Sequence, residues 1–316
     1  MWMRGMRGTC APSGVSSGRY SKQMRKPWLV LLSFALLTAV PRPAAAWGFE
    51  AHKYITARAI ALLPQEIRPY FEKYQAGIVE HSTDPDLWRT AGWTEEPPRH
   101  FVDMDAYGPY PFTGMPHAYD EAVKRYGVDF VIKNGTLPWR GEEMFAKLVE
   151  AFTQKTPYAR ENIQFFSSVL SHYCADAHVP FHAALNYDGQ LTGQWGIHSR
   201  FESELFERYQ SRLAVAPRPV APVASARELI FDSLTASFAL LQPVLDADKA
   251  AVAGRDSYDD AYFTAFFAKA GPVLEKRLSD SIADAASLIT AAWVAAGRPP
   301  LPLEATRTPR KVRREQ

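Results

Sequence analysis

Apolar residues recur at helical spacing along most of this chain, and that periodicity limits the possible folds more than any other feature of the sequence. No segment shows a convincing alternation of apolar and polar residues, which is the pattern of a half-buried strand. The sequence therefore predicts an all-α fold. The segments with helical spacing are 54–63, 67–79, 144–152, 163–177, 201–213, 229–245 and 258–296.

Proline-rich or glycine-rich stretches separate the expected helices. They lie at 97–116, 134–141, 186–197 and 215–224. Because the chain shows no internal repeat, we expect one compact multi-helix domain over residues 47–300. Residues 301–316, which include five basic side chains, are expected to form a solvated, disordered tail.

The first 46 residues have the organisation of a secretory signal peptide. Two basic residues precede an apolar run over 28–40, and residues 44–46 are the small alanines that a signal peptidase requires. Translation from Met24 gives a leader of ordinary length. We expect cleavage before Trp47 and a mature protein that is secreted or periplasmic. We expect no transmembrane anchor, because no later stretch approaches the roughly 20 apolar residues of a membrane helix.

Removal of the leader changes the charge of the protein. The chain has 36 Lys and Arg residues, of which seven precede Trp47, so 29 remain against 34 Asp and Glu, a formal charge of −5. An acidic body argues mildly against attraction to nucleic acid through phosphates alone, although bound divalent cations would offset it. Only Cys174 remains in the mature chain, so no disulfide can form within a monomer.

The mature chain keeps all eight histidines, and three of them stand near carboxylates. His172 and Asp176 are four residues apart at the end of an expected helix that a proline must terminate, and His182 follows that break. His198 and Glu202 repeat the spacing on the next expected helix. Zinc prefers imidazole nitrogen and carboxylate oxygen at about 2.0 to 2.2 Å. One such pair is as well explained by a surface hydrogen bond, but the two pairs together favour a zinc site.

The expected mature N-terminus adds a further potential ligand. The α-amino group of Trp47 has a reference pKa near 8, low enough for a metal to displace its proton, and the Trp47 carbonyl can complete a five-membered chelate. His52 follows within one turn of the first expected helix. The N-terminus is therefore a candidate part of the same metal site.

In these features the chain resembles the superfamily that joins zinc-dependent bacterial phospholipases C with the fungal single-strand nucleases called S-one/P-one. Its members begin with tryptophan and a nearby histidine, and then carry an Asp followed 14 or 15 residues later by His, a His-x3-Asp-x5-His run and a final His-x3-Asp or His-x3-Glu. The match covers residues 47–209 and fills nine ligand positions: Trp47, His52, Asp86, His100, His172, Asp176, His182, His198 and Glu202.

The resemblance implies three zinc ions bound by these nine residues. It assigns Asp86, His100 and His172 to one ion, Trp47 and His52 to a second, with Asp176 bridging the two, and His182, His198 and Glu202 to the third. It also implies phosphodiester hydrolysis, in which a bridging water becomes hydroxide near neutral pH and attacks phosphorus. Arg89 matches an arginine that neutralises the phosphate in the transition state, so the implied catalytic residues are Asp86, Asp176 and Arg89.

The resemblance leaves the substrate open between a phospholipid head group and single-stranded nucleic acid. Glu202 and the run 82–86 resemble the phospholipases, and we favour that branch. The nuclease alternative depends on Phe101 and Asp103, whose counterparts stack on a base and hydrogen-bond to it. A non-catalytic zinc-binding protein is a third hypothesis, against which Arg89 argues, because zinc storage does not require it.

Several other polar residues are expected to be structural. His178 matches a position that is not a ligand in the family, and His81 and His117 have no partner at metal spacing. Asp84 competes with Asp86 for the first zinc ion, but the 14-residue step to the next ligand histidine favours Asp86.

Two further expectations concern the surroundings of the site. Asp103 and Asp105 are candidate acceptors that orient ligand imidazoles. The aromatic residues over 258–267 are expected to belong to the core rather than to a substrate platform.

Overall fold

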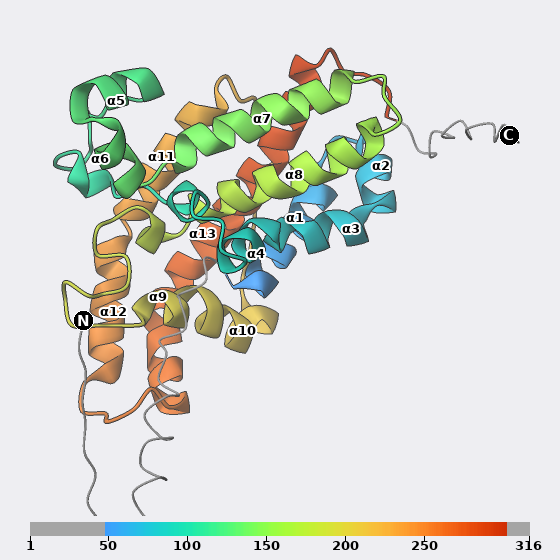
Figure 1. The fold of residues 1–316 in the computed structure, drawn as a ribbon. Coiled ribbons are helices and arrows are strands. Elements are labelled where there is room, and N and C mark those ends of the chain that lie inside the picture. Colours follow the sequence, from blue (N-terminus) through green and yellow to red (C-terminus); the bar gives the residue numbers. More distant parts are fainter. Residues whose placement is uncertain (1–47, 302–316) are drawn as a thin grey trace, which may run out of the picture. The chain divides into compact units, whose positions relative to one another are not determined.

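The structure, a computed structural model, describes residues 48–301, and every regular element in that range is a helix (Figure 1). The predicted all-α fold is therefore confirmed. The described residues belong to one compact unit. The expected leader, Trp47 and the tail beyond residue 301 lie outside the described residues.

The helices follow one another along the chain, and long connections without helix lie at 183–196 and 213–225. The α-helices are α1 (Phe49–Leu62), α2 (Arg68–Lys73), α3 (Gln75–Glu80), α4 (Asp84–Thr90), α5 (Tyr119–Tyr126), α6 (Val128–Lys133), α7 (Leu137–Thr153), α8 (Ala159–Asp176), α9 (Ile197–Ser199), α10 (Leu205–Tyr209), α11 (Ala226–Phe238), α12 (Leu241–Val252) and α13 (Asp260–Ala295). The shorter elements are the 3-10 turns η2 (His81–Thr83), η3 (Pro97–His100), η4 (Met104–Ala106), η5 (Pro180–His182) and η7 (Gln210–Arg212), and the π-helical turn η6 (Arg200–Glu204).

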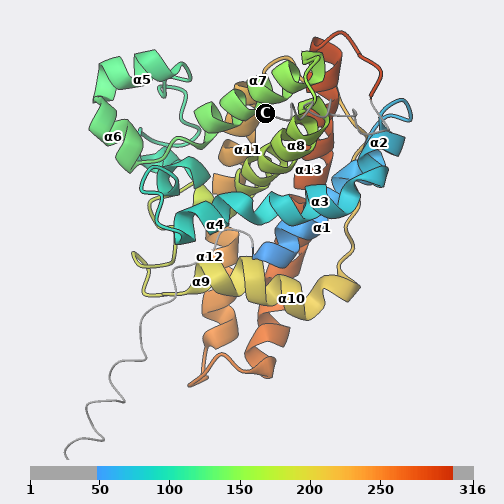
Figure 2. The same ribbon diagram turned by 45° about the vertical axis from the view of Figure 1, so that its right-hand side comes forward.

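Helix α8 is central to the packing. It packs against α7, α13, α1 and α3, and α7 and α8 run side by side in both views (Figure 1, Figure 2). Its C-terminal half, Ser167 to Asp176, is buried throughout. Polar side chains in this half are therefore removed from water and need partners within the protein or a bound ion.

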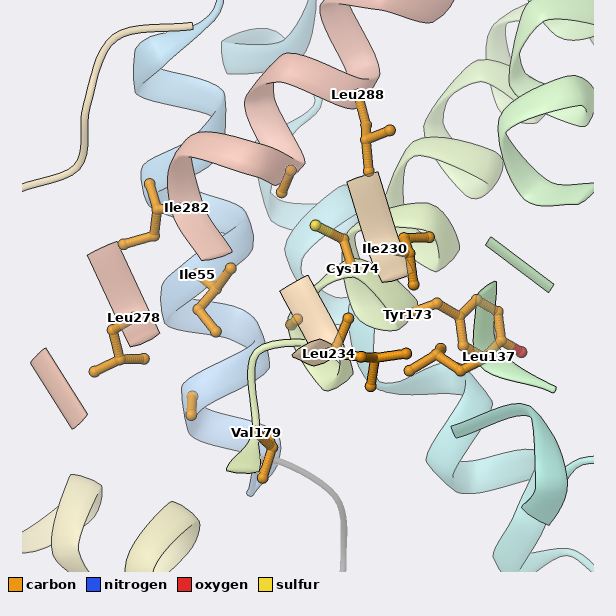
Figure 3. Close-up of a cluster of buried hydrophobic side chains, with 14 of the residues drawn as sticks. Ile55, Leu137, Tyr173, Cys174, Val179, Ile230, Leu234, Leu278, Ile282 and Leu288 are labelled. Carbon is orange, nitrogen blue, oxygen red and sulfur yellow. The ribbon is translucent and has the colours of Figure 1, made fainter. Parts of the chain in front are cut away.

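Apolar side chains from five helices hold the C-terminal half of α8 in place. Figure 3 labels buried members of this cluster from α1 (Ile55), α7 (Leu137), α8 (Tyr173 and Cys174), α11 (Ile230 and Leu234) and α13 (Leu278, Ile282 and Leu288). Full burial of one such side chain stabilises the fold by about 1.5–3 kcal/mol. The cluster therefore fixes the helix that also carries His172 and Asp176.

Two of the expected helices are divided in the structure. The segment 67–79 forms α2 and α3, because Tyr74 leaves the helical region of backbone conformations. The segment 229–245 forms parts of α11 and α12, with a turn at 239–240. A break of one or two residues leaves the apolar repeat almost unchanged, so periodicity does not detect it.

Elsewhere the structure has helix where the sequence analysis expected none. The expected break over 134–141 is wrong from residue 137 onward, since α7 begins at Leu137 with Pro138 in its first turn. A proline is tolerated there because the first N–H groups of a helix lack helical partners in any case. Helices α4, α5 and α6 had no expected counterpart, because each has eight residues or fewer and is too short to show a clear repeat.

Residues Ala226–Val252, which comprise α11 and α12, are long and apolar enough to cross a membrane by length and composition alone. By that measure the expectation that no stretch after the leader is sufficiently apolar is wrong. In the structure α11 packs against α7 and α12 packs against α13. The two helices therefore pack as core helices of the domain.

Candidate metal centre

Eight of the nine expected ligand residues gather in three buried groups, and the ninth, Trp47, lies outside the described residues. In each group, one potential ligand atom from every member lies within 4.8 Å of the others. The groups are His52, Asp86 and His172; His100, His172 and Asp176; and His182, His198 and Glu202. All eight side chains are buried, so their polar atoms cannot rely on water.

Helix α8 supplies the two residues on which the first two groups depend. His172 and Asp176 project from the same face, with His172 Nε2 3.3 Å from Asp176 Oδ2, as the four-residue spacing predicts. His172 Nδ1 donates a hydrogen bond of 2.8 Å to the carbonyl oxygen of Ser82. That bond leaves Nε2 unprotonated and directed into the cluster, the arrangement that metal-binding histidines commonly have.

His52 approaches the same point from α1. Its ring stacks on that of His172 with centroids 3.9 Å apart, and its Nε2 lies 3.4 Å from Asp176 Oδ1. Neither ring nitrogen of His52 has a hydrogen-bond partner. A fully buried imidazole without a partner is costly unless it binds a cation.

Asp86 and Arg89 come from α4. Both carboxylate oxygens of Asp86 are buried and lack hydrogen-bond partners, although Arg89 Nη2 lies 3.2 Å from Oδ1. Asp84, the competing residue, instead contacts the exposed His81 at 2.9 Å. Of the two aspartates, Asp86 is therefore the one that the structure places among the histidines.

His100 faces the cluster with its Nδ1 atom, whereas His172 faces it with Nε2. His100 Nδ1 lies 2.9 Å from Asp176 Oδ2 and 3.2 Å from His172 Nε2. Its Nε2 lies 3.5 Å from Oε1 of Glu96, a fully buried carboxylate that also accepts a hydrogen bond from the Tyr173 hydroxyl. Glu96 therefore orients His100.

Sequence reasoning missed Glu96. Its signal was the four-residue step to His100, the same spacing that identified the other pairs. Burial raises the pKa of Glu96, but the close contact with His100 and the hydrogen bonds from Tyr173 and Arg99 outweigh burial and lower that pKa to about 2. Glu96 is therefore an anion at neutral pH and can orient its partner electrostatically.

The third group consists of His182 from η5, His198 from α9 and Glu202 from η6. His182 Nδ1 donates a 2.6 Å hydrogen bond to the carbonyl oxygen of His100, and its Nε2 lies 3.9 Å from Glu202 Oε2. His198 Nε2 lies 2.9 Å from the same oxygen. His182 Nδ1 is also 3.7 Å from Asp176 Oδ1, so this group adjoins the other two.

The geometry of the three groups, and the electrostatics of the third, fit divalent cations. Ligand atoms at about 2.0 to 2.2 Å from a tetrahedral zinc ion lie about 3.3 Å apart, and the separations given above run from 2.9 to 3.9 Å. Burial lowers the pKa of His182 to about 3 and that of His198 to about 4. Both rings are therefore neutral at pH 7, which is the form that binds metal.

Carboxylates crowd the site without enough cationic side chains to balance them. Burial, with Asp176 and Asp86 nearby, raises the pKa of Glu202 well above its usual value. Both Glu202 oxygens are buried and have no hydrogen-bond partner. A divalent cation among these groups would relieve both the repulsion and the desolvation.

The structure allows more than one division of the ligands between ions. His172 belongs to both of the first two groups, and His100 Nδ1 also lies 3.8 Å from Asp86 Oδ1. The assignment of Asp86, His100 and His172 to one ion is therefore sterically possible. It remains a proposal alongside the grouping that pairs Asp86 with His52.

The residues that were expected to lie beside the metal ligands differ in burial and in hydrogen-bond partners. Phe101 is half-buried directly after His100, and Asp103 carries a buried carboxylate oxygen without a partner. Burial, with Asp105 nearby, raises the pKa of Asp103 to about 7. The expectation that Asp103 and Asp105 orient imidazoles is not met by any hydrogen bond of the described residues. Instead, Asp105 accepts a bond from the backbone N–H of Leu185.

The three histidines expected to be structural lie outside the metal groups and have other partners. His178 bonds to the Cys174 carbonyl and to Asp284. His117 contacts Glu228, and His81 contacts Asp84, as described above. Among the aromatic residues expected in the core, Tyr262, Phe263 and Phe266 are fully buried and Phe267 is half-buried. The expectation is wrong for Tyr258, which is 45% exposed.

An all-helical domain in which three such groups adjoin defines a candidate multinuclear metalloenzyme. A family model described as zinc dependent phospholipase C matches residues 51–242, more than half of the chain. The protein therefore belongs to the zinc-dependent phospholipase C family, and the resemblance to these phospholipases is confirmed. Membership makes it a zinc-dependent phosphodiester hydrolase and favours an enzyme over a non-catalytic zinc-binding protein. A comparison with curated proteins finds no match.

Proposed function

We propose that the protein is an exported phospholipase C that uses three zinc ions to hydrolyse the phosphodiester bond of a phospholipid. Water adds across the bond between phosphorus and the glycerol oxygen, which yields diacylglycerol and a phosphorylated head group. The leader supports export, with the mature protein secreted or periplasmic. The family assignment supports a phospholipid as substrate.

The observation that carries this proposal is the contact between the three groups. Asp176 lies within 3.4 Å of His52, within 2.9 Å of His100 and within 3.7 Å of His182. A single carboxylate thus adjoins residues of every group. Ions bound there would act on one phosphate together, rather than at separate structural sites.

Bound zinc supplies Lewis acidity for phosphate oxygens and lowers the pKa of water to about 7. The residues of the chain would position these ions and the substrate. Asp176 is proposed to bridge two ions, and the group of His182, His198 and Glu202 is proposed to hold the third. Arg89 is only partly buried, and its Nε lacks a hydrogen-bond partner. Its guanidinium can therefore donate to a phosphate oxygen next to Asp86.

The free amine of Trp47 is proposed as a further ligand after leader cleavage. Gly48, the first described residue, is buried against Ser203, beside Glu202, and a Cβ at Gly48 would come within 2.7 Å of Ser203 Oγ. The close approach supports an N-terminus near the ligands. One extra residue before Trp47 should remove most activity and one ligand, as measured by hydrolysis and zinc content. A single residue added at the C-terminus serves as the control, and full activity of the N-terminally extended form would contradict the assignment.

A single-strand nuclease remains the second candidate function. The observation in its favour is the unpartnered, buried oxygen of Asp103 beside the half-buried Phe101, since a base could stack on the ring and hydrogen-bond to the carboxylate. The acidic body of the mature chain argues against it.

Parallel assays of the zinc-loaded protein test the two functions. Hydrolysis of bis(p-nitrophenyl) phosphate reports phosphodiesterase activity of either kind, and phosphatidylcholine and single-stranded DNA then separate them. We expect release of diacylglycerol and little shortening of the DNA. Cleavage of the DNA without hydrolysis of phosphatidylcholine would overturn the phospholipase proposal.

A further inference from the structure

The loop at residues 185–195 connects two parts of the metal centre. It begins three residues after His182 and ends three residues before His198. Four of its side chains are large, apolar and exposed: Leu185 (39%), Tyr187 (51%), Leu191 (70%) and Trp195 (64%). Four large exposed apolar side chains within eleven residues are a concentration of apolar surface of the kind that interaction sites show.

Two polar side chains of the same loop point inward, whereas Thr192 is exposed. Asn186 and Gln194 are buried, and Asn186 Oδ1 accepts a 2.9 Å hydrogen bond from the backbone N–H of Leu191. Gln194 Nε2 donates to the Leu245 carbonyl at 2.8 Å and to Asp248 at 2.7 Å, both on α12. Asn186 and Gln194 therefore anchor the loop from inside, while its large apolar side chains remain exposed.

Buried ionic groups fix the end of the loop. Arg200, which is only 4% exposed, donates to the carbonyl oxygens of Trp195 at 2.7 Å and of Gln194 at 3.2 Å. Its guanidinium is held in turn by Asp248 at 3.1 Å. These bonds fix the backbone of the loop at Gln194 and Trp195, and in that conformation the Trp195 side chain is 64% exposed. Its exposure is a property of the folded loop.

The chemistry of the loop favours a lipid surface over other partners. Residues 185–195 contain no Lys or Arg, and their one carboxylate, Asp188, accepts a bond from the His198 backbone N–H at 3.3 Å. Binding to nucleic acid needs cationic side chains. Leucine, tyrosine and tryptophan are suited to the boundary between lipid head groups and acyl chains, where aromatic rings meet both apolar and polar surroundings.

We propose that loop 185–195 docks on the surface of a phospholipid bilayer and inserts the side chains of Leu191 and Trp195 among the head groups. This inference rests on the proposed phospholipase function. The additional claim is that the docked loop holds the metal centre next to phospholipid that is still in the bilayer. Since the loop is nearly uncharged, the attraction is apolar and insensitive to salt.

The double substitution Leu191→Ser with Trp195→Ser tests this surface. Sedimentation with phosphatidylcholine vesicles should show binding by the zinc-loaded protein, at low and high salt alike. We expect binding to weaken about tenfold for each side chain, or about a hundredfold for the pair. Tyr158→Ser is the matched control, because Tyr158 is 69% exposed and lies between α7 and α8.

Hydrolysis of a soluble short-chain phosphatidylcholine, measured beside the vesicle assay, separates the two proposals. The inference is supported if the double variant loses far more activity on vesicles than on the soluble lipid and the control variant does not. It is overturned if the wild-type protein hydrolyses the soluble lipid but does not bind vesicles. It is also overturned if the double substitution abolishes a concentration-dependent dimer, since a second copy then covers the loop. Vesicle binding without hydrolysis of any lipid would refute the phospholipase function but not the docking surface.

Discussion

Two buried histidine–carboxylate clusters adjoin the C-terminal end of α8, and they differ in how their polar atoms are satisfied. In the metal centre, both nitrogens of His52 and one oxygen of Asp176 lack hydrogen-bond partners. His178 lies only two residues beyond Asp176, yet both of its nitrogens have partners. Nδ1 donates to the Cys174 carbonyl at 2.8 Å, and Nε2 lies 3.0 Å from Asp284 Oδ2.

The charge balance of the two clusters differs in the same way. Asp284 also pairs with Arg218, so a cationic side chain of the protein compensates its charge. Glu202, by contrast, has other carboxylates as neighbours, and its pKa is raised by burial and by that repulsion. A buried histidine beside a carboxylate is therefore not evidence for a metal by itself. Several unpartnered ligand atoms that converge with an excess of negative charge are much stronger evidence.

The largest effect is expected from Asp176→Asn. The substitution removes the carboxylate that adjoins all three groups, so we expect loss of nearly all phosphodiesterase activity and of at least one zinc ion per chain. Zinc content by elemental analysis and hydrolysis of bis(p-nitrophenyl) phosphate measure the two effects. A variant that retained its full zinc content and activity would show that Asp176 is as structural as Asp284.

Asp284→Asn is the matched change in the other cluster. The substitution removes the charge that accepts a hydrogen bond from the buried His178 and pairs with the half-exposed Arg218. Hydrogen bonds to charged groups contribute about 1.5–3 kcal/mol, so we expect a loss of stability of that size. Chemical denaturation measures this loss, while zinc content should stay unchanged. A loss of zinc without a loss of stability would mean that the two clusters are not independent.

The contribution of Asp284 should also depend on pH. Burial raises its pKa, but the hydrogen bond from His178 and the nearby Arg218 and Arg277 outweigh that effect and lower it. Its pKa in the folded protein is thus below the value of 3.8 for a free aspartate. The stabilisation is present above that value and is lost as the pH falls through the folded pKa, so wild type and variant should converge in acid.

From the sequence we could predict that ligand residues with a regular helical spacing lie close together. His172 with Asp176, and His198 with Glu202, lie four residues apart on helices, so their proximity follows from local geometry. The groups that orient the rings were not predictable in this way. The imidazole of His172 is held by the carbonyl of Ser82, and a backbone carbonyl leaves no trace in the sequence. The short helices α4, α5 and α6 were missed because each has eight residues or fewer and shows no clear apolar repeat.

Glu96→Gln sharpens the comparison, because Glu96 acts on the metal centre only through His100. Loss of the negative charge behind a ligand imidazole should weaken zinc binding about 10-fold to 100-fold. Competition with a zinc chelator measures this affinity, and Glu80→Gln at the exposed contact with Lys53 is the control. Equal affinities in both variants and wild type would show that Glu96 supports only the packing of Tyr173.

The smallest effect is expected at an exposed pair, His117 with Glu228. Both side chains are more than a third exposed, and pairs of this kind contribute less than about 1 kcal/mol. Burial raises the pKa of Glu228, but the hydrogen bond from His117 and the nearby Arg227 outweigh burial and lower that pKa. Any stabilisation is therefore present above the value of 4.5 for a free glutamate and is lost in acid. Denaturation of the Glu228→Gln variant at low and high salt measures the contribution, which salt should reduce further. A loss as large as that expected for Asp284→Asn would show that burial and missing partners do not rank the histidine–carboxylate pairs of this protein.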